Sequence, residues 1–331
     1  MEDSWTKILQ KFPSSNFLQS PLWAETNRLM GHKIVVQTFD DKAVYLGIVK
    51  DARRGRYLEI PAGPLLDWSD KPLKKSVFND IIEKAKQNHC VFVRFRPQLE
   101  NTEENQKLIR ALKSSSLDLR PAPMHLHAQN TVLLDLNKSE DDLLMSMRRQ
   151  TRYEVRRGEK LNLKVEEDSS ENSIKTFHSV QAETAKRQNF IPPSLKELLA
   201  EKSAFKDNLK LYIVKTPENQ PIAYGLVLFY GQEAAYFEAA STELNYKLPG
   251  SPTLLWFAIK DMKNLGLSRF NLWGIAPPGV QNHRYSGVTT FKTGFGGRVV
   301  EYIPAADIVL DKFRYKIDEL VETLRKKKRN L

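Results

Sequence analysis

The chain has 331 residues, of which 41% are hydrophobic and 27% charged, so it is long enough for two globular domains and too apolar to be disordered. Its formal net charge of +11 favours a polyanionic partner: nucleic acid, an acidic membrane surface or a phosphate-rich substrate. The single cysteine, Cys90, excludes an internal disulfide and a multi-cysteine metal site.

The start of the chain and its apolar segments indicate where the protein resides. The first residues, MEDSWTKILQKF, include acids and no long apolar stretch, unlike a secretory signal. No apolar segment approaches the roughly 18 residues needed to cross a bilayer. We therefore expect a cytoplasmic protein, which could contact the inner face of the membrane peripherally.

Strand and helix patterns alternate along the chain. In the first half the expected elements are a helix at 20–30, strands at 33–39, 43–49 and 57–64, a helix at 74–87 and a strand at 91–95. In the second they are a strand at 131–136, helices at 140–160, 177–188 and 194–203, strands at 211–215, 223–230 and 234–240, a helix at 253–265, a strand at 269–272 and a helix at 311–331. Both halves contain three strands, a loop, a helix and a strand. We therefore predict an α/β fold built from two copies of one unit.

Four segments carry a resemblance to a known family. Residues 287–302 read GVTTFKTGFGGRVVEY and residues 146–165 read SMRRQTRYEVRRGEKLNLKV. Near the start, 17–31 reads FLQSPLWAETNRLMG, and 183–190 reads ETAKRQNF. These segments resemble, respectively, the C-terminal signature, the basic helix, the opening Gln-Ser/Thr-x-x-Trp motif and the acceptor-side segment of the Fem family.

The resemblance implies two tandem GNAT-like acyltransferase domains with mixed sheets flanked by helices. We expect the first domain at 1–132, joined by 305–331, and the second at 133–304. It also implies an aminoacyltransferase that moves an amino acid from aminoacyl-tRNA to an amine of a peptidoglycan precursor, either a UDP-linked or a lipid-linked muropeptide. No cofactor is expected.

The pair Phe291-Lys292 is the predicted catalytic element. The resemblance places it at the tRNA end and at the oxyanion that forms when an amine attacks the aminoacyl ester. Because the ester is already activated, proximity and a cation beside the oxyanion can supply most of the acceleration. The plain alternative is a strand-edge lysine in solvent beside a core phenylalanine.

The basic helix is the predicted contact with tRNA. Its Arg149, Arg152, Arg156 and Lys160 lie along one helical face, where they could track phosphates. The alternative is an ordinary solvated helix face. The run at 325–329 is less specific and could meet RNA, anionic lipid or neither.

Four residues are the predicted substrate-binding set. The resemblance places Arg187 at the acceptor's phosphates and Tyr236 at the acceptor. Two departures leave the identity of the acceptor open: Asn27 stands where relatives with a known acceptor site have a lysine and is followed by Arg28, and Glu238 replaces a second tyrosine.

Two other functions remain alternatives. An acyl-CoA-dependent N-acyltransferase of the same fold would bind pyrophosphate with the amides of a glycine-rich loop that opens a helix. The loop at 247–252 has one glycine and two prolines, and 284–289 mimics the motif only before a strand-like segment. The second alternative is a non-catalytic RNA-binding paralogue. No metal is expected, because His125-x-His127 has no third ligand nearby.

Overall fold

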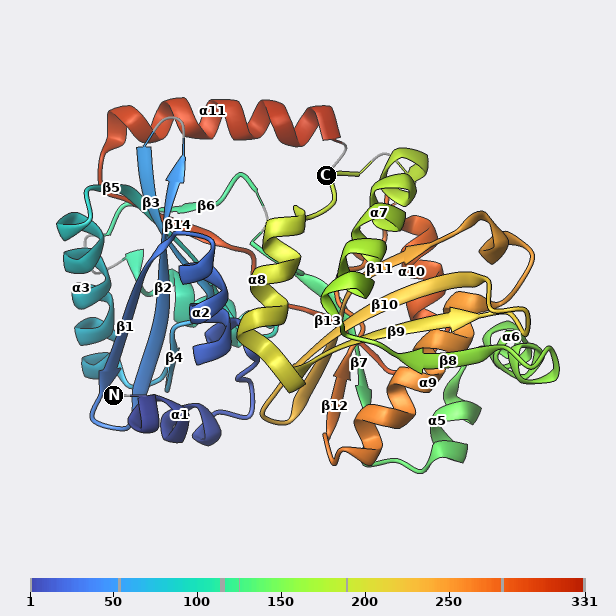
Figure 1. Cartoon of the computed structure of the whole chain (residues 1–331). Helices are drawn as coiled ribbons and strands as arrows, with labels where there is room; N and C mark the ends of the chain where they lie inside the picture. Colours follow the sequence, from blue (N-terminus) through green and yellow to red (C-terminus); the bar gives the residue numbers. More distant parts are fainter. Residues whose placement is uncertain are drawn as a thin grey trace. The chain divides into compact units, whose positions relative to one another are not determined.

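The computed structural model describes residues 2–52, 55–113, 117–124, 126–188, 190–280 and 283–329. The chain forms two compact units (Figure 1). Unit 1 comprises Met1–Asn130, Ala276–Arg284 and Val300–Leu331, and unit 2 comprises Thr131–Ile275 and Tyr285–Val299. No helix in the described ranges is long and apolar enough to cross a bilayer.

Unit 1 is built on a mixed sheet with the strand order β1-β2-β3-β5-β14-β6, and β4 pairs with β2. Its strands are β1 (Lys33–Phe39), β2 (Ala43–Ala52), β3 (Gly55–Ala62), β4 (Leu65–Leu66), β5 (Cys90–Pro97), β6 (Leu119–Pro121) and β14 (Ala306–Val309). Its helices are α1 (Glu2–Lys11), α2 (Pro21–Leu29), α3 (Lys71–Gln87), α4 (Glu103–Arg110) and α11 (Lys312–Arg329), with a 3-10 turn at Phe17–Gln19.

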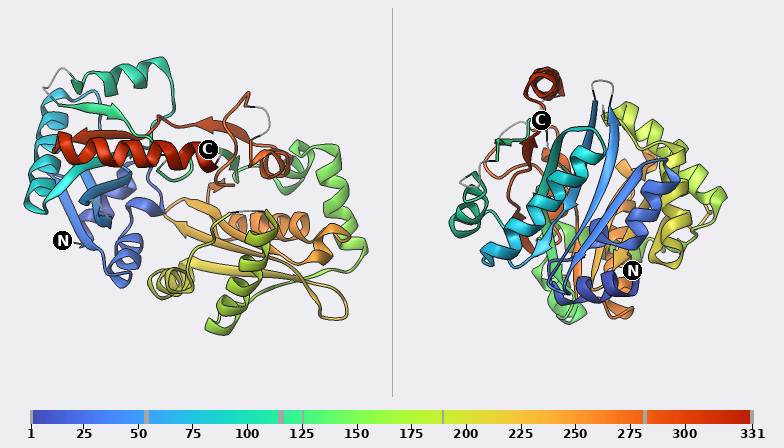
Figure 2. Two further views of the ribbon diagram at one scale, coloured as in Figure 1. Left: turned by 90° about the horizontal axis from the view of Figure 1, so that it is seen from above. Right: turned by 90° about the vertical axis from the view of Figure 1, so that its left-hand side faces the viewer.

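The α3 helix is the crossover of unit 1. Asp70 caps its start by accepting a hydrogen bond from the Leu73 amide, and Val77, Phe78 and Ile81 bury its apolar face. It joins β3 to β5, which pair in parallel. The α3 helix covers one face of the sheet, and α1 and α2 cover the other (Figures 1 and 2).

Unit 2 repeats this arrangement in a sheet with the order β13-β7-β12-β11-β10-β9-β8. Its strands are β7 (Asn130–Asp135), β8 (Lys164–Glu167), β9 (Leu209–Lys215), β10 (Pro221–Tyr230), β11 (Glu233–Ser241), β12 (Arg269–Asn271) and β13 (Arg298–Glu301). Its helices are α5 (Glu140–Ser146), α6 (Arg149–Lys160), α7 (Glu171–Gln188), α8 (Leu195–Phe205), α9 (Gly250–Asn264) and α10 (Ser286–Thr293), with 3-10 turns at Lys206–Asn208 and Glu243–Tyr246.

The two sheets confirm the predicted repeat. The meander β1-β2-β3 continues through α3 to parallel β5, and the meander β9-β10-β11 continues through α9 to parallel β12. In each sheet an antiparallel strand lies next to that parallel strand, β14 beside β5 and β7 beside β12, and one more strand follows, β6 and β13 respectively.

The structure corrects the predicted helix at 140–160, which is two helices. Met147 and Arg148 between them have extended backbone, with ψ angles of 150° and 143°. A residue far away in the sequence holds the chain at this break: the Arg148 amide donates a hydrogen bond to the carbonyl of Gly294 at 2.8 Å. A second correction concerns the strand-like segment expected after 284–289: the helix α10 begins within that stretch, at Ser286, and continues to Thr293.

The observed units also differ from the expected domain limits. Residues 276–284 and 300–304 belong to unit 1, whereas the prediction placed them in the second domain. The reason is backbone pairing: the Tyr302 amide donates to Gln129 at 2.8 Å, and Tyr302 forms a β-bridge with Glu100.

Candidate active site

The Phe291-Lys292 pair lies in the last turn of α10, inside unit 2. Lys292 is only 8% exposed, and its ammonium donates a hydrogen bond to the carbonyl of Gly274 at 3.0 Å. Phe291 is partly buried and meets Phe295 edge-on, with ring centroids 5.3 Å apart. The structure therefore corrects the alternative of a solvated strand-edge lysine: this lysine is buried on a helix.

The glycines after α10 have a structural role that side chains would prevent. Gly296 and Gly297 have φ angles of +79° and +84°, a region in which residues with a Cβ are strained. A Cβ on Gly297 would also lie 2.6 Å from the Leu133 carbonyl oxygen of β7. These glycines let the chain turn from α10 into β13 and so set the position of Lys292.

The acceptor of the Lys292 hydrogen bond lies in a loop fixed by Asn271, the last residue of β12. The buried Asn271 side-chain oxygen accepts from the Thr131 hydroxyl at 2.5 Å and from the Trp273 amide at 2.9 Å. Trp273 has a φ of +63°, and the Thr131 hydroxyl also contacts its carbonyl at 3.1 Å. The Gly274 carbonyl is therefore held in place before any substrate arrives.

Lys292 interacts electrostatically with Glu238 of β11. Burial lowers the pKa of Lys292 to about 7, and the charge of Glu238 limits the fall. Burial, together with the charge of Glu197, raises the pKa of Glu238 to about 7, opposed by a 2.6 Å hydrogen bond from Gln181 and by Lys292. Both groups therefore titrate near neutral pH, which is a common property of catalytic acids and bases.

A β-bulge separates Glu238 from Tyr236. Leu226 of β10 pairs with Glu238 and Val227 pairs with Tyr236, so Phe237 is the extra residue. Tyr236 is buried in the core of unit 2, where a Cβ on Gly225 would lie 2.7 Å from its ring. Glu238 instead reaches Gln181 on α7. The two predicted acceptor residues, only two positions apart, thus point to different faces of the sheet.

Three side chains of α7 hold the end of β11. Gln181 contacts Glu238, Thr184 donates to the Ser241 carbonyl at 3.0 Å, and Arg187 also donates to that carbonyl. Arg187 is exposed beyond this contact. The predicted residue Arg187 and the Glu238 carboxylate therefore share one helix–strand edge of unit 2.

The basic helix α6 presents a different set from the predicted one. Arg149, Arg156 and Lys160 are exposed and aligned, whereas Arg152 turns back and donates to the carbonyls of Met145, at 3.0 Å, and Met147. Tyr153 is exposed on the same face as the three cations. Sequence reasoning missed Tyr153, although the spacing 149, 153, 156, 160 was a sufficient signal.

Arg148 links α6 to the lysine helix. Its amide bonds to the Gly294 carbonyl, and its guanidinium donates to the Thr290 carbonyl at 2.8 Å. A Cβ on Gly294 would lie 2.4 Å from the Thr151 hydroxyl. The basic helix and the end of α10 are therefore one packed assembly, which sequence reasoning did not foresee.

Arg28 lies in unit 1, on the α2 helix. Its guanidinium is exposed and pairs with Glu25 at 3.1 Å. The preceding Asn27 is buried and accepts a hydrogen bond from the ammonium of Lys50 at 2.9 Å. Lys50 of β2 therefore contacts Asn27 of α2, the position at which the resemblance in the sequence implies a lysine.

A second polar cluster lies close to Lys50 in unit 1. The Glu59 carboxylate lies 3.7 Å from the His127 ring. Burial raises the pKa of Glu59, but His127, Lys50 and Arg94 lower it by more, so the pKa of Glu59 is below its ordinary value. His125, the other histidine of the proposed pair, lies outside the described residues.

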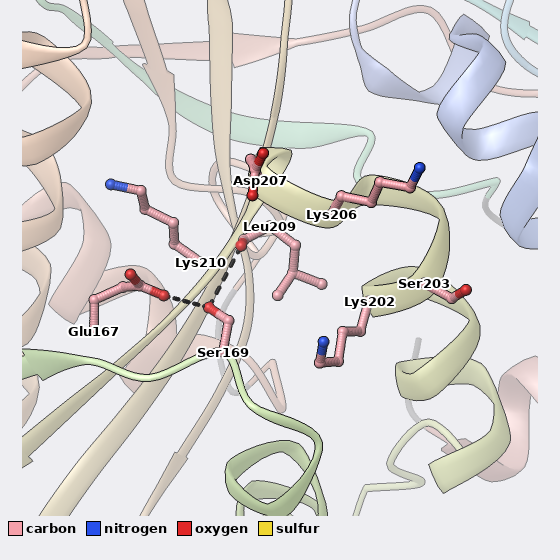
Figure 3. A pocket seen from close by; sticks show the side chains of 8 residues that line it. All are labelled: Glu167, Ser169, Lys202, Ser203, Lys206, Asp207, Leu209 and Lys210. Carbon is pink, nitrogen blue, oxygen red and sulfur yellow. Dashed lines mark hydrogen bonds between the residues drawn. The ribbon is translucent and has the colours of Figure 1, made fainter.

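A pocket of about 490 Å³ lies elsewhere in unit 2 (Figure 3). Its lining residues are Glu167, Ser169, Lys202, Ser203, Lys206, Asp207, Leu209 and Lys210. The Lys210 ammonium is engaged by Asp261 at 2.6 Å, and two carboxylates offset the other two lysines. None of the predicted site residues lines this pocket.

Comparison with known proteins shows the family. The sequence model described as the FemAB family matches residues 2–196 and 193–323. The aminoacyltransferase FemA of Staphylococcus epidermidis is 21% identical, with 82% of this chain and 84% of that protein covered. Among solved structures, the crystal structure of FemX superposes with a TM-score of 0.84 at 17% identity, covering 96% of this chain and 98% of that one.

A tandem GNAT protein from the clavulanic acid biosynthesis pathway superposes with a TM-score of 0.50 at 8% identity, covering 81% of this chain and 79% of that one. The two repeated sheets and this likeness show a tandem GNAT-like fold, as predicted. The chain belongs to the FemAB family, which confirms the resemblance seen in its motifs. It is an aminoacyltransferase.

Proposed function

We propose that this aminoacyltransferase moves an amino acid from aminoacyl-tRNA to an amine on the stem peptide of a peptidoglycan precursor, as in cross-bridge formation. The observation that carries the proposal is the buried Lys292 on α10, within the glycine-containing signature. Burying a lysine side chain destabilises a fold. Acyl transfer requires a cation that is stabilised when the oxyanion forms beside it, and a buried lysine can supply that cation.

The chemistry needs no covalent enzyme intermediate. The acceptor amine attacks the ester carbon, an oxyanion forms, the C–O bond to the ribose breaks and an amide bond remains. The attacking nitrogen loses one proton and the leaving ribose oxygen gains one, so no net proton acceptor is required. Lys292 stabilises the oxyanion as an ammonium ion, and Glu238, which titrates near neutrality, relays the proton between the two.

The exposed face of α6 is proposed to hold the tRNA. Arg149, Arg156 and Lys160 can contact phosphates, and Tyr153 offers a surface on which a base can stack. Arg148 connects this face directly to the Lys292 helix. A tRNA bound along α6 would therefore have its acceptor end held near α10.

For the acceptor, Arg187 is the proposed phosphate ligand, because its guanidinium is exposed at the edge that also carries Glu238. The phosphates could belong to a nucleotide-linked or to a lipid-linked muropeptide. The roles of Arg28 and Tyr236 in acceptor binding stay predictions, and Tyr236 is buried in the core of unit 2.

The start of α9 disfavours the acyl-CoA alternative. The amide of Gly250 bonds to Leu248 at 2.9 Å, and that of Ser251 to the side chain of Asn245 at 2.8 Å. Pro252 has no amide hydrogen, and Thr253 bonds to Pro249 at 3.1 Å. The pyrophosphate of CoA would find no available backbone donor among these four residues.

The proposal is tested by transfer of a radiolabelled amino acid from a mixed aminoacyl-tRNA pool to muropeptide. Wild type is compared with Lys292→Ala and with Lys263→Ala. Lys263 is a matched control, because its ammonium also donates to a backbone carbonyl of unit 2, that of Leu136 at 2.8 Å. We expect transfer to fall at least about a hundredfold in Lys292→Ala only. Acylation that depends on acetyl-CoA, with no transfer from tRNA, would refute the proposal.

The tRNA contact is tested by affinity at several salt concentrations. In Arg149→Ala/Arg156→Ala, the slope of log affinity against log salt should fall by about 2, because two phosphate contacts are lost. Lys71→Ala/Lys75→Ala removes the same charge from exposed positions of α3 and should leave the slope unchanged. Equal effects in both double variants would mean that net charge alone governs binding. Equal affinity for charged and uncharged tRNA, without transfer, would favour the RNA-binding alternative.

A further inference from the structure

The α11 helix attaches to unit 1 through a polar face. The Tyr315 hydroxyl donates to Asp307 at 2.9 Å, and Glu322 lies 2.8 Å from Arg94, which also pairs with Asp307 at 2.7 Å. Glu319 lies 3.8 Å from Arg120. The residues that face the sheet are thus a tyrosine and acids, the reverse of the usual helix that packs by an apolar stripe.

The apolar residues of α11 lie on the opposite side. Phe313 is 78% exposed, Ile317 45%, Leu320 61% and Leu324 57%. Their spacing of four, three and four residues places them in one narrow stripe. At 100° per residue this stripe is about 180° away from the buried Tyr315 and the paired Glu322. Four large apolar side chains aligned on one exposed face are more than the scattered single residues found on most surfaces.

The charges of α11 are sorted with respect to this stripe. Lys312 and Lys316 flank it on one side, and Arg314 and Arg325 flank it on the other. The acids of the helix, Asp318, Glu319 and Glu322, lie on the half that faces unit 1. The exposed half therefore combines an apolar stripe with cations on both borders.

We propose that α11 is a membrane-docking helix that lies flat on an anionic lipid bilayer, with the stripe Phe313, Ile317, Leu320 and Leu324 inserted among the acyl chains and the flanking cations at the lipid phosphates. A helix with a strong apolar face, a basic border and low overall hydrophobicity binds in the plane of the interface. Lysine and arginine near the surface of an anionic membrane each add attraction to its lipids.

Charge decides between a bilayer and a second copy of the chain. If two α11 helices paired through their stripes, the cations of one would lie against the cations of the other, whereas helices that pair carry opposite charges beside the seam. An anionic bilayer complements both borders at once. The exposed pair Arg314–Asp311, 3.7 Å apart, is weak enough for lipid phosphates to replace.

The inference does not depend on aminoacyl transfer, since it rests on α11 and unit 1 alone. It is tested by sedimentation of the full chain with vesicles of phosphatidylcholine, with and without about a third phosphatidylglycerol, in low and high salt. Wild type is compared with Leu320→Ser and with Phe313→Ser/Leu320→Ser. The matched control is Leu265→Ser, which removes a leucine that is 49% exposed at the end of α9 in unit 2.

We expect wild type and Leu265→Ser to bind the anionic vesicles and to be released by salt. Leu320→Ser should bind about tenfold more weakly and the double variant more weakly still, because each apolar side chain lost from the interface costs about that factor. Thermal unfolding checks that the exposed substitutions leave the fold intact. Equal binding of all four proteins, or no binding by wild type, would overturn the inference. So would a wild-type dimer that dissociates on Leu320→Ser, because the stripe would then be covered by a second copy.

Discussion

The substitution Lys292→Met tests whether this lysine is retained for function at the expense of stability. Methionine is of similar length and has no charge. The pKa of Lys292 is about 7, against 10.5 for a solvated lysine. This difference of 3.5 pKa units, at about 1.36 kcal/mol each, corresponds to about 5 kcal/mol of destabilisation by the buried amine. Loss of the hydrogen bond to the Gly274 carbonyl would destabilise the variant by about 1 kcal/mol.

We therefore expect Lys292→Met to raise the free energy of unfolding by about 4 kcal/mol near pH 7 and to abolish transfer. The pH dependence of this stability difference follows from proton binding. Between about pH 7 and 10.5 the unfolded lysine is protonated and the folded one is not, so the unfolded state binds more protons. The destabilisation is complete below pH 7 and is lost as the pH rises through this window. The advantage of the methionine variant should vanish with it.

The assay is urea unfolding followed by circular dichroism at about pH 7, 8.5 and 10. Lys263→Met is the control, since the ammonium of Lys263 also bonds to a backbone carbonyl of unit 2 without being fully buried. If Lys292→Met is less stable than wild type by the same amount at every pH, the ammonium of Lys292 stabilises the fold. The reasoning that makes it a functional group would then be refuted.

Three further outcomes follow from particular contacts. Glu238→Gln removes the negative charge that raises the pKa of Lys292. The fall in transfer rate at high pH should therefore begin at a lower pH, and an unchanged pH profile would exclude an interaction between Glu238 and Lys292. Gly158→Ala places a Cβ 2.0 Å from the Thr253 hydroxyl and should lower the free energy of unfolding by about 2 kcal/mol, with a smaller loss when Thr253→Ala is added. Arg94→Met leaves two buried or partly buried acids unpaired, and urea unfolding should show a loss of about 3 kcal/mol or more.

The repeated architecture could be predicted because it depends on local patterns. Strands such as Lys33–Phe39 alternate or run apolar between turn residues, and α2 begins with Ser-Pro, as helix starts often do. The membership of the family was readable for the same reason, since its motifs are short segments. These features need no knowledge of distant contacts.

The details of the site could not be predicted, because they are fixed by distant contacts. The segment containing Val288, Thr289 and Thr290 favours a strand by propensity, yet Arg148 bonds to it and it forms α10. The same arginine breaks the long helix predicted at 140–160 without any glycine or proline to signal the break. The bulge at Phe237, which separates two residues of the predicted site, likewise leaves no mark in the sequence.

The position of β14 has a consequence for the order in which the protein can be made. This strand, Ala306–Val309, lies between β5 and the edge strand β6 in the unit 1 sheet, while the strands of unit 2 all precede residue 302. During synthesis β6 therefore has no partner strand until β14 has left the ribosome, by which time unit 2 can already be complete. Although domains usually fold from the N-terminus onward, here the second unit can finish first. The unpaired edges of β5 and β6 are then the part of the nascent chain most in need of protection from aggregation.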